Sequence, residues 1–293
     1  MDKSSASREI LLEQRRIRRE QFFSNPGLII GLVGFIIIVL AAVIVPAVSH
    51  VDPNAMDIPN RLKEPSLEHL FGTDEFGRDL LIRILCGARV SLAVGCSVAL
   101  LSCLFGTIIG IYASYFKILD HIFMRVCEGL IAIPGILLAI ALMSALDAGS
   151  LNVVIALTIV YTPSVARVVR SSALVTKGRL YVEAAKVQGA SSGRILWKLI
   201  LPNVISPLTV QASFIFAQAI ISEASLSFLG AGVPATEPSW GNILQSSKSV
   251  LSKAPWTVIF PGLAVILCVL SLNLLGDGLR DYLDPRTAGR KKK

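Results

Sequence analysis

The sequence has little charge. Asp, Glu, Lys and Arg together make up 16% of its 293 residues, whereas a soluble domain usually carries about 25% charged residues. Hydrophobic residues make up 53% of the chain. A chain this apolar is not expected to fold as an ordinary soluble domain, and we interpret it as a membrane protein.

Residue patterns for metal, nucleic-acid and nucleotide chemistry are missing. The three histidines are far apart and none belongs to an H-E-x-x-H pattern, so no metal site and no cofactor are expected. Basic residues are not interleaved with aromatic residues as in a nucleic-acid groove, so no nucleic acid is expected as a partner. The dipeptide Gly-Lys of a Walker A loop does not occur. Any ATP hydrolysis would therefore belong to a separate subunit, and no catalytic residues are expected here.

The five cysteines form no C-x-x-C pair. Four lie within apolar runs and Cys86 lies at the edge of one; the four are Cys96, Cys103, Cys127 and Cys268. We interpret all five as small buried residues.

Six segments are apolar and long enough to cross a bilayer, because a hydrocarbon core of about 30 Å needs roughly 20 apolar residues as helix. They are Gly27–Val48, Arg89–Phe116, Ile122–Leu146, Leu151–Val169, Val204–Gly230 and Pro255–Gly276. Each run is continuously apolar, which predicts an all-α membrane protein with six transmembrane helices. Pro134 and Pro163 are expected to kink the third and fourth spans, and Gly106 and Gly110 have a spacing that permits close helix contact in the second.

Lys and Arg are distributed unevenly between the two sides of these spans. Twenty-one of the 28 fall before the first span, after the sixth, and in the segments that follow the second and fourth. The other seven fall on the opposite side. Because cytoplasmic segments carry the excess of Lys and Arg, both termini are expected in the cytoplasm.

Residues 181–203 read YVEAAKVQGASSGRILWKLILPN and interrupt the apolar runs on the predicted cytoplasmic side. The pattern predicts one helix that ends at Gly189, a second helix capped by Ser191 or Ser192, and the start of the fifth span at Pro202. Its alanines would let another protein approach closely. The composition alone favours a solvated connector between two spans.

The spacing within this segment resembles the signature loop of the permease subunits of ABC importers. The matching residues are Glu183, Ala184, Ala185, Gly189, Leu199, Leu201 and Pro202, with Leu199 where that family usually has Ile. The resemblance implies a type I ABC importer permease in a bacterial cytoplasmic (inner) membrane. It also implies that residues 180–203 form a coupling helix seated in a groove of an ATPase subunit.

Three further stretches resemble the dipeptide, oligopeptide and nickel permease branch of that family: Phe71–Leu92, Ser222–Leu244 and Leu272–Arg286. The resemblance implies three kinds of partner, namely a second and different permease subunit, two ATP-binding subunits and an extracytoplasmic solute-binding protein. Di- or oligopeptides are the expected solute. Nickel, glutathione or another small solute stays open, as does an ATPase-independent secondary transporter, whereas an intramembrane enzyme is disfavoured.

Local chemistry within Phe71–Leu92 predicts an amphipathic helix at the outer interface, ahead of the second span. Asp74 is expected to cap a helix there, and Asp79 and Arg83 are expected to form an i,i+4 ion pair.

Two acidic residues fall inside predicted spans. Glu128 lies one helical turn after Arg125, and we interpret it either as half of a structural ion pair or as part of a pathway or gate. Glu223 lies near the outer end of the fifth span, where a pathway-facing position and a helix–helix contact are equally open.

The predicted organisation has five parts. A basic cytoplasmic segment (1–26) precedes the first transmembrane helix (27–48) and an extracytoplasmic loop with an interfacial helix (49–88). A five-helix permease core (89–276) contains the coupling loop (180–203) and is followed by a basic cytoplasmic tail (277–293). Apart from the other subunits, membrane lipid is the expected surrounding.

Overall fold

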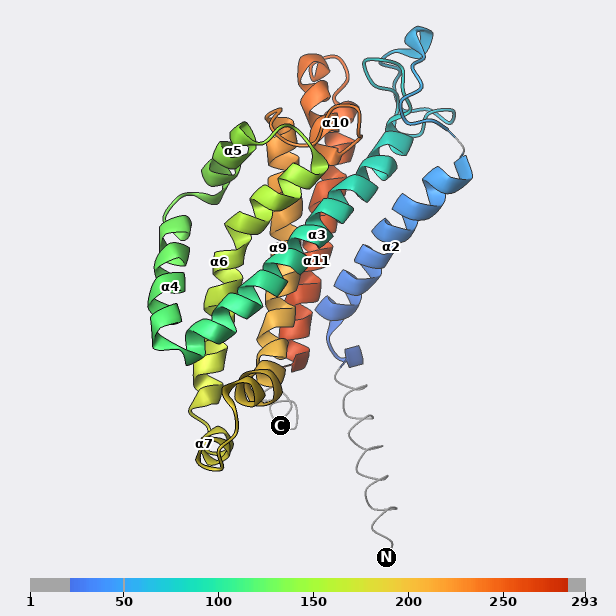
Figure 1. The fold of residues 1–293 in the computed structure, drawn as a ribbon. Coiled ribbons are helices and arrows are strands. Elements are labelled where there is room, and N and C mark those ends of the chain that lie inside the picture. The colour runs from blue at the N-terminus through green and yellow to red at the C-terminus, as the bar shows by residue number, and fades with distance from the viewer. Residues whose placement is uncertain (1–21, 50, 284–293) are drawn as a thin grey trace, which may run out of the picture.

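The structure, a computed structural model, describes residues 22–49 and 51–283. The basic segment before residue 22 and the tail after residue 283 lie outside the described residues. Five long helices run side by side at a tilt and form the body of the molecule (Figure 1). They are α2 (Pro26–Ser49), α3 (Leu80–Tyr115), α6 (Ser150–Lys177), α9 (Leu201–Phe228) and α11 (Trp256–Leu283).

Shorter elements occupy the two ends and one side of this bundle. They are η1 (Ile58–Asn60), α4 (Lys117–Ile131), α5 (Gly135–Ala145), α7 (Leu180–Val187), α8 (Ser192–Arg194), η2 (Ile195–Ile200), α10 (Trp240–Ser246) and η3 (Ser247–Val250). In Figure 1 α7 projects from one end, which we call the hairpin end, and residues 51–79 with α10 form the opposite loop end.

The third predicted span is bent far more sharply than the kink expected at Pro134. The five long helices are each apolar and long enough to cross a membrane, and within residues 22–49 and 51–283 a sixth crossing exists only if α4 and α5 count as one. These two helices meet at 95° across the break at Ala132–Pro134. Pro134 lacks a backbone N–H and restricts the residue before it to extended backbone, so the helix ends and restarts rather than kinks. At Pro163, in contrast, α6 continues without interruption.

Small residues set the closest helix contacts. A Cβ on Gly106 would lie 2.6 Å from the Val165 side chain, and one on Gly110 would lie 2.6 Å from the carbonyl oxygen of Ala166. The small-residue spacing predicted for close packing is therefore where α3 meets α6. A second close contact fixes the first helix, because a Cβ on Gly31 of α2 would lie 2.5 Å from the backbone nitrogen of Leu275 in α11.

The segment before the second span folds differently from the prediction. No separate α-helix precedes the span within residues 51–79; α3 begins at Leu80 and continues to Tyr115. Its N-cap is Asp79, whose carboxylate accepts a hydrogen bond from the Ile82 amide at 3.0 Å and also contacts His69. Asp79 is therefore engaged, and the predicted pair with Arg83 does not form.

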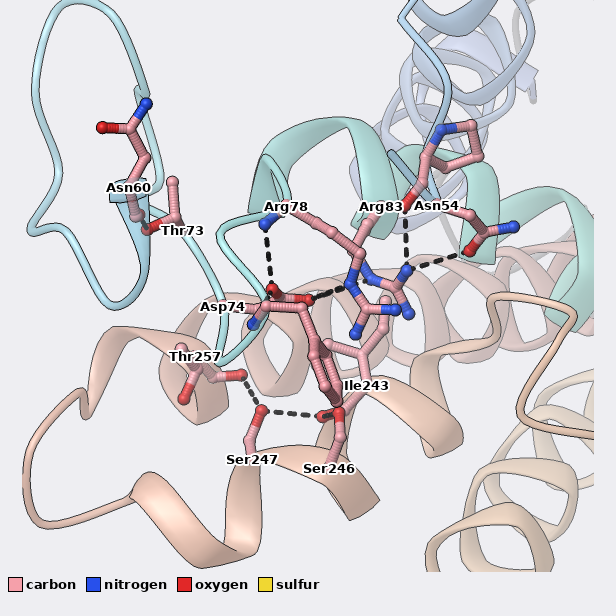
Figure 2. A network of polar contacts seen from close by, with 12 residues as sticks. Asn54, Asn60, Thr73, Asp74, Arg78, Arg83, Ile243, Ser246, Ser247 and Thr257 are labelled. Carbon is pink, nitrogen blue, oxygen red and sulfur yellow. Dashed lines mark hydrogen bonds and ion pairs between the residues drawn. The ribbon is translucent and has the colours of Figure 1, made fainter. Parts of the chain in front are cut away.

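Asp74 is the centre of a buried polar network rather than a helix cap (Figure 2). Its carboxylate accepts hydrogen bonds from the amides of Phe76 and Arg78 and a 2.6 Å bond from the Arg78 side chain. The guanidinium of Arg83 lies 3.5 Å from the same carboxylate and donates to the carbonyl of Pro53 at 2.9 Å. These bonds tie residues 53–78 to the first turn of α3, which fixes the fold of the loop end.

The cysteine prediction holds for only part of the set. Cys127 and Cys268 are buried, Cys86 and Cys103 are half-buried, and Cys96 is exposed. Cys96 faces outward because the apolar surroundings of a membrane helix include lipid as well as protein, and sequence hydropathy does not distinguish the two.

Candidate functional site

The segment between α6 and α9, residues 178–203, forms a helical hairpin that we call the coupling hairpin. Its first arm, α7, ends at Val187, and the predicted terminator Gly189 follows two residues later with φ +80°, a conformation that glycine adopts without strain. The Gly189 amide donates to Lys186 and the Ala190 amide to Ala185, both at 3.0 Å, which satisfies the last carbonyls of α7. Ser191, one of the two predicted caps, accepts from the Arg194 amide and starts α8.

The hairpin buries one set of apolar side chains and exposes another. Val182 and Ile195 are fully buried where the two arms meet the helix ends. Leu180 and Val187 are 83% and 89% exposed. Glu183 and Ala184 are exposed beside them and Ala185 is half-buried. The predicted Glu-Ala-Ala residues thus belong to a small exposed surface of apolar and short side chains with one carboxylate.

The second arm is continuous with a spanning helix. The residues Ser192–Phe228 form one helical run through α8, η2 and α9. The segment η2 is π-helical, and the amide of Leu201 bonds to the carbonyl of Leu196, five residues earlier. Leu199 is half-buried in this segment, and Pro202 stands in the first turn of α9, where its missing N–H leaves no hydrogen bond unmade. A force on the hairpin would therefore reach α9 through helix rather than loop.

The end of α3 braces the hairpin, which sequence reasoning missed. The hydroxyl of Ser192 donates to the Tyr115 hydroxyl at 3.4 Å, and the Lys177 and Lys186 ammonium groups lie 5.2 and 5.7 Å from the centre of the Tyr115 ring. Lys177 also donates to the carbonyl of Ser114 at 3.0 Å. No sequence pattern pairs Tyr115 with residues this far along the chain, so only the fold reveals the contact.

The turn of the hairpin also fits the spacing Gly-x-Ser-x-Gly at residues 189–193. In hydrolases with that motif the serine stands on a sharp turn between a strand and a helix. Here the turn joins two helices, and Ser191 accepts a backbone hydrogen bond as a helix cap. The match gives no support for a nucleophile.

Glu128 lies on α4 in the half of the bundle next to the hairpin end. It is 64% exposed, and its carboxylate is 3.9 Å from the guanidinium of Arg125, which is too long for a strong hydrogen bond. Both side chains line a hollow of about 970 Å³ between α4 and α6. Glu128 is therefore a loosely paired charge on an open polar surface.

Glu223 lies elsewhere, and the structure does not bring the two acidic residues together. Its side chain is fully buried; the carboxylate accepts hydrogen bonds from Ser91 at 2.7 Å and Ser227 at 2.8 Å. Ser91 in turn accepts from the Trp240 amide, and Ser227 from the Val233 amide. Glu223 thus joins α3, α9 and α10 in a helix–helix contact.

No group of three His, Cys, Asp or Glu side chains lies together as a metal site would need, in the part of the chain that the structure describes.

The family described as binding-protein-dependent transport system inner membrane component matches residues 104–289, which include the whole coupling hairpin. The chain belongs to this family. The description N-terminal TM domain of oligopeptide transport permease C matches residues 14–65, which include α2. This permease is therefore built from a core that carries the hairpin and an N-terminal helix docked on it.

Relatives of the permease match along nearly its whole length. A chain named as a peptide transport system permease protein of Brucella suis is 48% identical over 277 residues, which cover 94% of this chain and 92% of that one. The dipeptide transport system permease protein DppC of Alkalihalophilus pseudofirmus is 42% identical, with 91% and 88% covered. The glutathione transport system permease protein GsiD of Escherichia coli O6:K15:H31 is 40% identical, with 94% and 90% covered.

A solved structure has the same fold. A chain of the inward-facing MetNI methionine ABC transporter aligns with TM-score 0.58 at 18% identity and covers 70% of this permease and 96% of that chain. At this identity the likeness concerns the fold alone, which is that of an ABC importer permease.

Proposed function

We propose that this permease is one of two membrane subunits of an ATP-driven importer of short peptides. The observation that carries the proposal is the coupling hairpin itself, within a chain whose relatives bear the names of peptide and dipeptide permeases. The permease supplies half of the pathway, and ATP is hydrolysed by a pair of separate ATPase subunits. An extracytoplasmic binding protein delivers the solute.

The exposed surface of the hairpin supports docking on an ATPase. Leu180 and Val187 would be costly to leave in water at the tip of a projecting element, and such surfaces usually mark a protein interface. Ala184 and Ala185 let a partner backbone approach closely, and the Glu183 carboxylate can accept from a partner donor. Leu199 and Pro202 fix the second arm onto α9, so ATPase closure is transmitted to the pathway.

The excess of Lys and Arg supports an orientation with the hairpin and both termini in the cytoplasm. The loop end, with its Asp74 network, then faces the solute-binding protein. One chain carries one hairpin, and two ATPases need two, so a second permease subunit completes the assembly. The resemblance to the dipeptide, oligopeptide and nickel permease branch favours a sister chain of different sequence.

The test is uptake by proteoliposomes that contain this permease, its sister permease, both ATPases and the binding protein. We expect ATP-dependent uptake of labelled dialanine, with glutathione and Ni²⁺ as competing solutes. Uptake of dialanine that needs ATP and is lost without the sister chain supports the proposal. Uptake of glutathione or Ni²⁺ in preference to dialanine would reassign the solute, and uptake driven by an ion gradient without ATPase would reject the importer.

A further inference from the structure

The hollow beside Glu128 lies where α4 and α6 approach each other near the hairpin end. Its polar lining comes from three helices, namely α4 (Asp120, His121, Arg125 and Glu128), α6 (Ser164, Arg167, Arg170, Ser171 and Ser172) and α9 (Gln211). Its volume of about 970 Å³ is at the upper end of the range of small-molecule sites. Three helices of the permease core thus line an open hollow that is large enough for a short peptide.

This hollow does not face hydrocarbon. Arg125 is 88% exposed and Glu128 64% exposed, and both stand on α4, which is half of a bent membrane segment. Ionisable residues in such segments face water-filled cavities or the bundle interior, because lipid does not solvate charge. The opposite side of α4 is different, since Phe123, Val126 and Leu130 line a separate hollow of about 590 Å³ with almost wholly apolar walls. The helix α4 therefore has one polar and one apolar face, and the polar face meets water.

The charges on the polar wall are not all paired. The guanidinium of Arg170 binds the carboxylate of Asp120 with two hydrogen bonds, at 2.5 and 2.6 Å, so this pair is satisfied. Arg167, one helical turn earlier on α6, is exposed and has no hydrogen bond or ion pair with any residue in the described part of the chain. Arg167 therefore offers an unoccupied planar guanidinium to whatever enters the hollow.

We propose that Arg167 binds the terminal carboxylate of a peptide in the cytoplasmic half of the pathway, as the peptide leaves the transporter. The guanidinium group fits a carboxylate with two parallel hydrogen bonds. Glu128, on the facing helix, receives the peptide's ammonium group, so the hollow is complementary to a zwitterion. This site rests on the proposed function, and it assigns to this chain a direct part in selecting free peptides.

Weak binding is what such a position requires. A site on a conduction route must hold its ligand firmly enough for it to enter and loosely enough for it to leave. Arg167 is exposed to water, which weakens its ion pairs compared with buried ones. The site therefore does not compete with the binding protein for the solute, and it is expected to fill at millimolar peptide.

The experiment uses the complete complex of this permease, its sister and both ATPases, in the inward-facing state without ATP or binding protein. A dipeptide of alanine and photo-leucine is added at millimolar concentration and cross-linked by light, and its adducts are mapped by mass spectrometry. We expect adducts on α4 and α6 around Met124 and Val168, which line the hollow. The same peptide with an amidated C-terminus should give at least five-fold fewer adducts at these positions.

Variants assign the effect to a residue. Arg167→Gln should reduce the adducts of the free peptide at least five-fold and leave those of the amidated peptide unchanged. Lys117→Gln is the matched control, because Lys117 carries the same charge as Arg167, is the first residue of α4 and does not line the hollow. Lys117→Gln should leave the adducts of both the free and the amidated peptide unchanged. The comparison of free with amidated peptide uses the unmodified permease, so the test stands even if Arg167→Gln fails to assemble.

The outcomes separate the site from the function. Equal labelling by free and amidated peptide, or undiminished labelling in Arg167→Gln, would overturn the carboxylate site. An absence of adducts in the hollow, in a preparation that imports the same dipeptide once the binding protein and ATP are added, would overturn the site and leave the proposed function intact. A preparation that imports glutathione or Ni²⁺ but no dipeptide would overturn both.

Discussion

The first helix contains a proline whose structural cost is offset by an arginine from another helix. Pro46 lies inside α2 and has no N–H, so the carbonyl of Ala42, four residues earlier, has no partner within the helix. Arg89 of α3 donates from Nε to that carbonyl at 2.6 Å and from Nη2 to the carbonyl of Val43 at 2.7 Å. The arginine therefore completes the hydrogen bonding that the proline interrupts, and it links α2 to α3.

The energy at stake follows from these two bonds. Replacing Arg89 with Met orphans one carbonyl at a cost of about 1–3 kcal/mol, and it removes a second bond from a charged donor. We expect Arg89→Met to lower the free energy of unfolding by about 2 kcal/mol. In a Pro46→Ala background the restored backbone amide can bond to the Ala42 carbonyl, so Arg89→Met should then cost about 1 kcal/mol or less. The assay is a double-mutant cycle on SDS unfolding of the purified permease in detergent micelles.

Two comparisons make the result decisive. Arg89→Lys keeps the charge but not the two-pronged geometry, so it should retain only part of the stability. Arg61→Met is the control for loss of a cation, because Arg61 is exposed in the loop end and its side chain donates no such bonds within residues 51–283. A loss for Arg89→Met that is equal with and without Pro46 would refute the reasoning, since it would show that the arginine acts independently of the proline.

Other predictions concern helix packing and the brace on the hairpin. Gly31→Ala should destabilise the permease by about 1–3 kcal/mol, because its Cβ would lie 2.5 Å from backbone of α11 that cannot move aside. The control is Gly262→Ala, whose Cβ would meet no atom within 4 Å, and it should be neutral or stabilising. Equal thermal unfolding of the two variants would contradict this prediction. Tyr115→Leu should lower the peptide imported per ATP at least two-fold at normal membrane levels, because Ser192 and two lysines lose their contact. Tyr115→Phe keeps the ring and should retain most of the coupling; loss in both variants to the same extent would argue against the lysine–ring contacts.

The parts of the structure that depend on nearby residues were predictable from the sequence. The hairpin follows from Gly189, which permits a left-handed turn, and from Ser191, which caps the next helix two residues later. A close helix contact on α3 follows from the spacing of Gly106 and Gly110, whereas its partner, α6, is known only from the structure. In each case the information lies within a few residues and a local rule connects it to the structure.

The features that the sequence did not predict share a different cause. The spacing of Asp79 and Arg83 predicts an i,i+4 ion pair. It does not reveal that His69 and the N-terminus of α3 already occupy the Asp79 carboxylate. Pro134 marks the position of the break between α4 and α5, yet its 95° angle depends on packing that the sequence does not state. Tyr115 and Arg167 matter through neighbours from other helices, so neither can be identified before the helices are placed together.

Ala185→Asp tests most directly whether the hairpin transmits ATPase movement to the pathway. An aspartate inside α7 costs less than about 0.7 kcal/mol in helix propensity, so the fold should persist while a like charge stands beside Glu183 on the docking surface. In proteoliposomes with all partner subunits we expect peptide-stimulated ATP hydrolysis and peptide uptake to fall at least ten-fold together. Ala148→Asp, an exposed position at the other end of the bundle, should leave both near normal. Uptake and stimulated hydrolysis at wild-type rates in Ala185→Asp would show that the hairpin is only a connector.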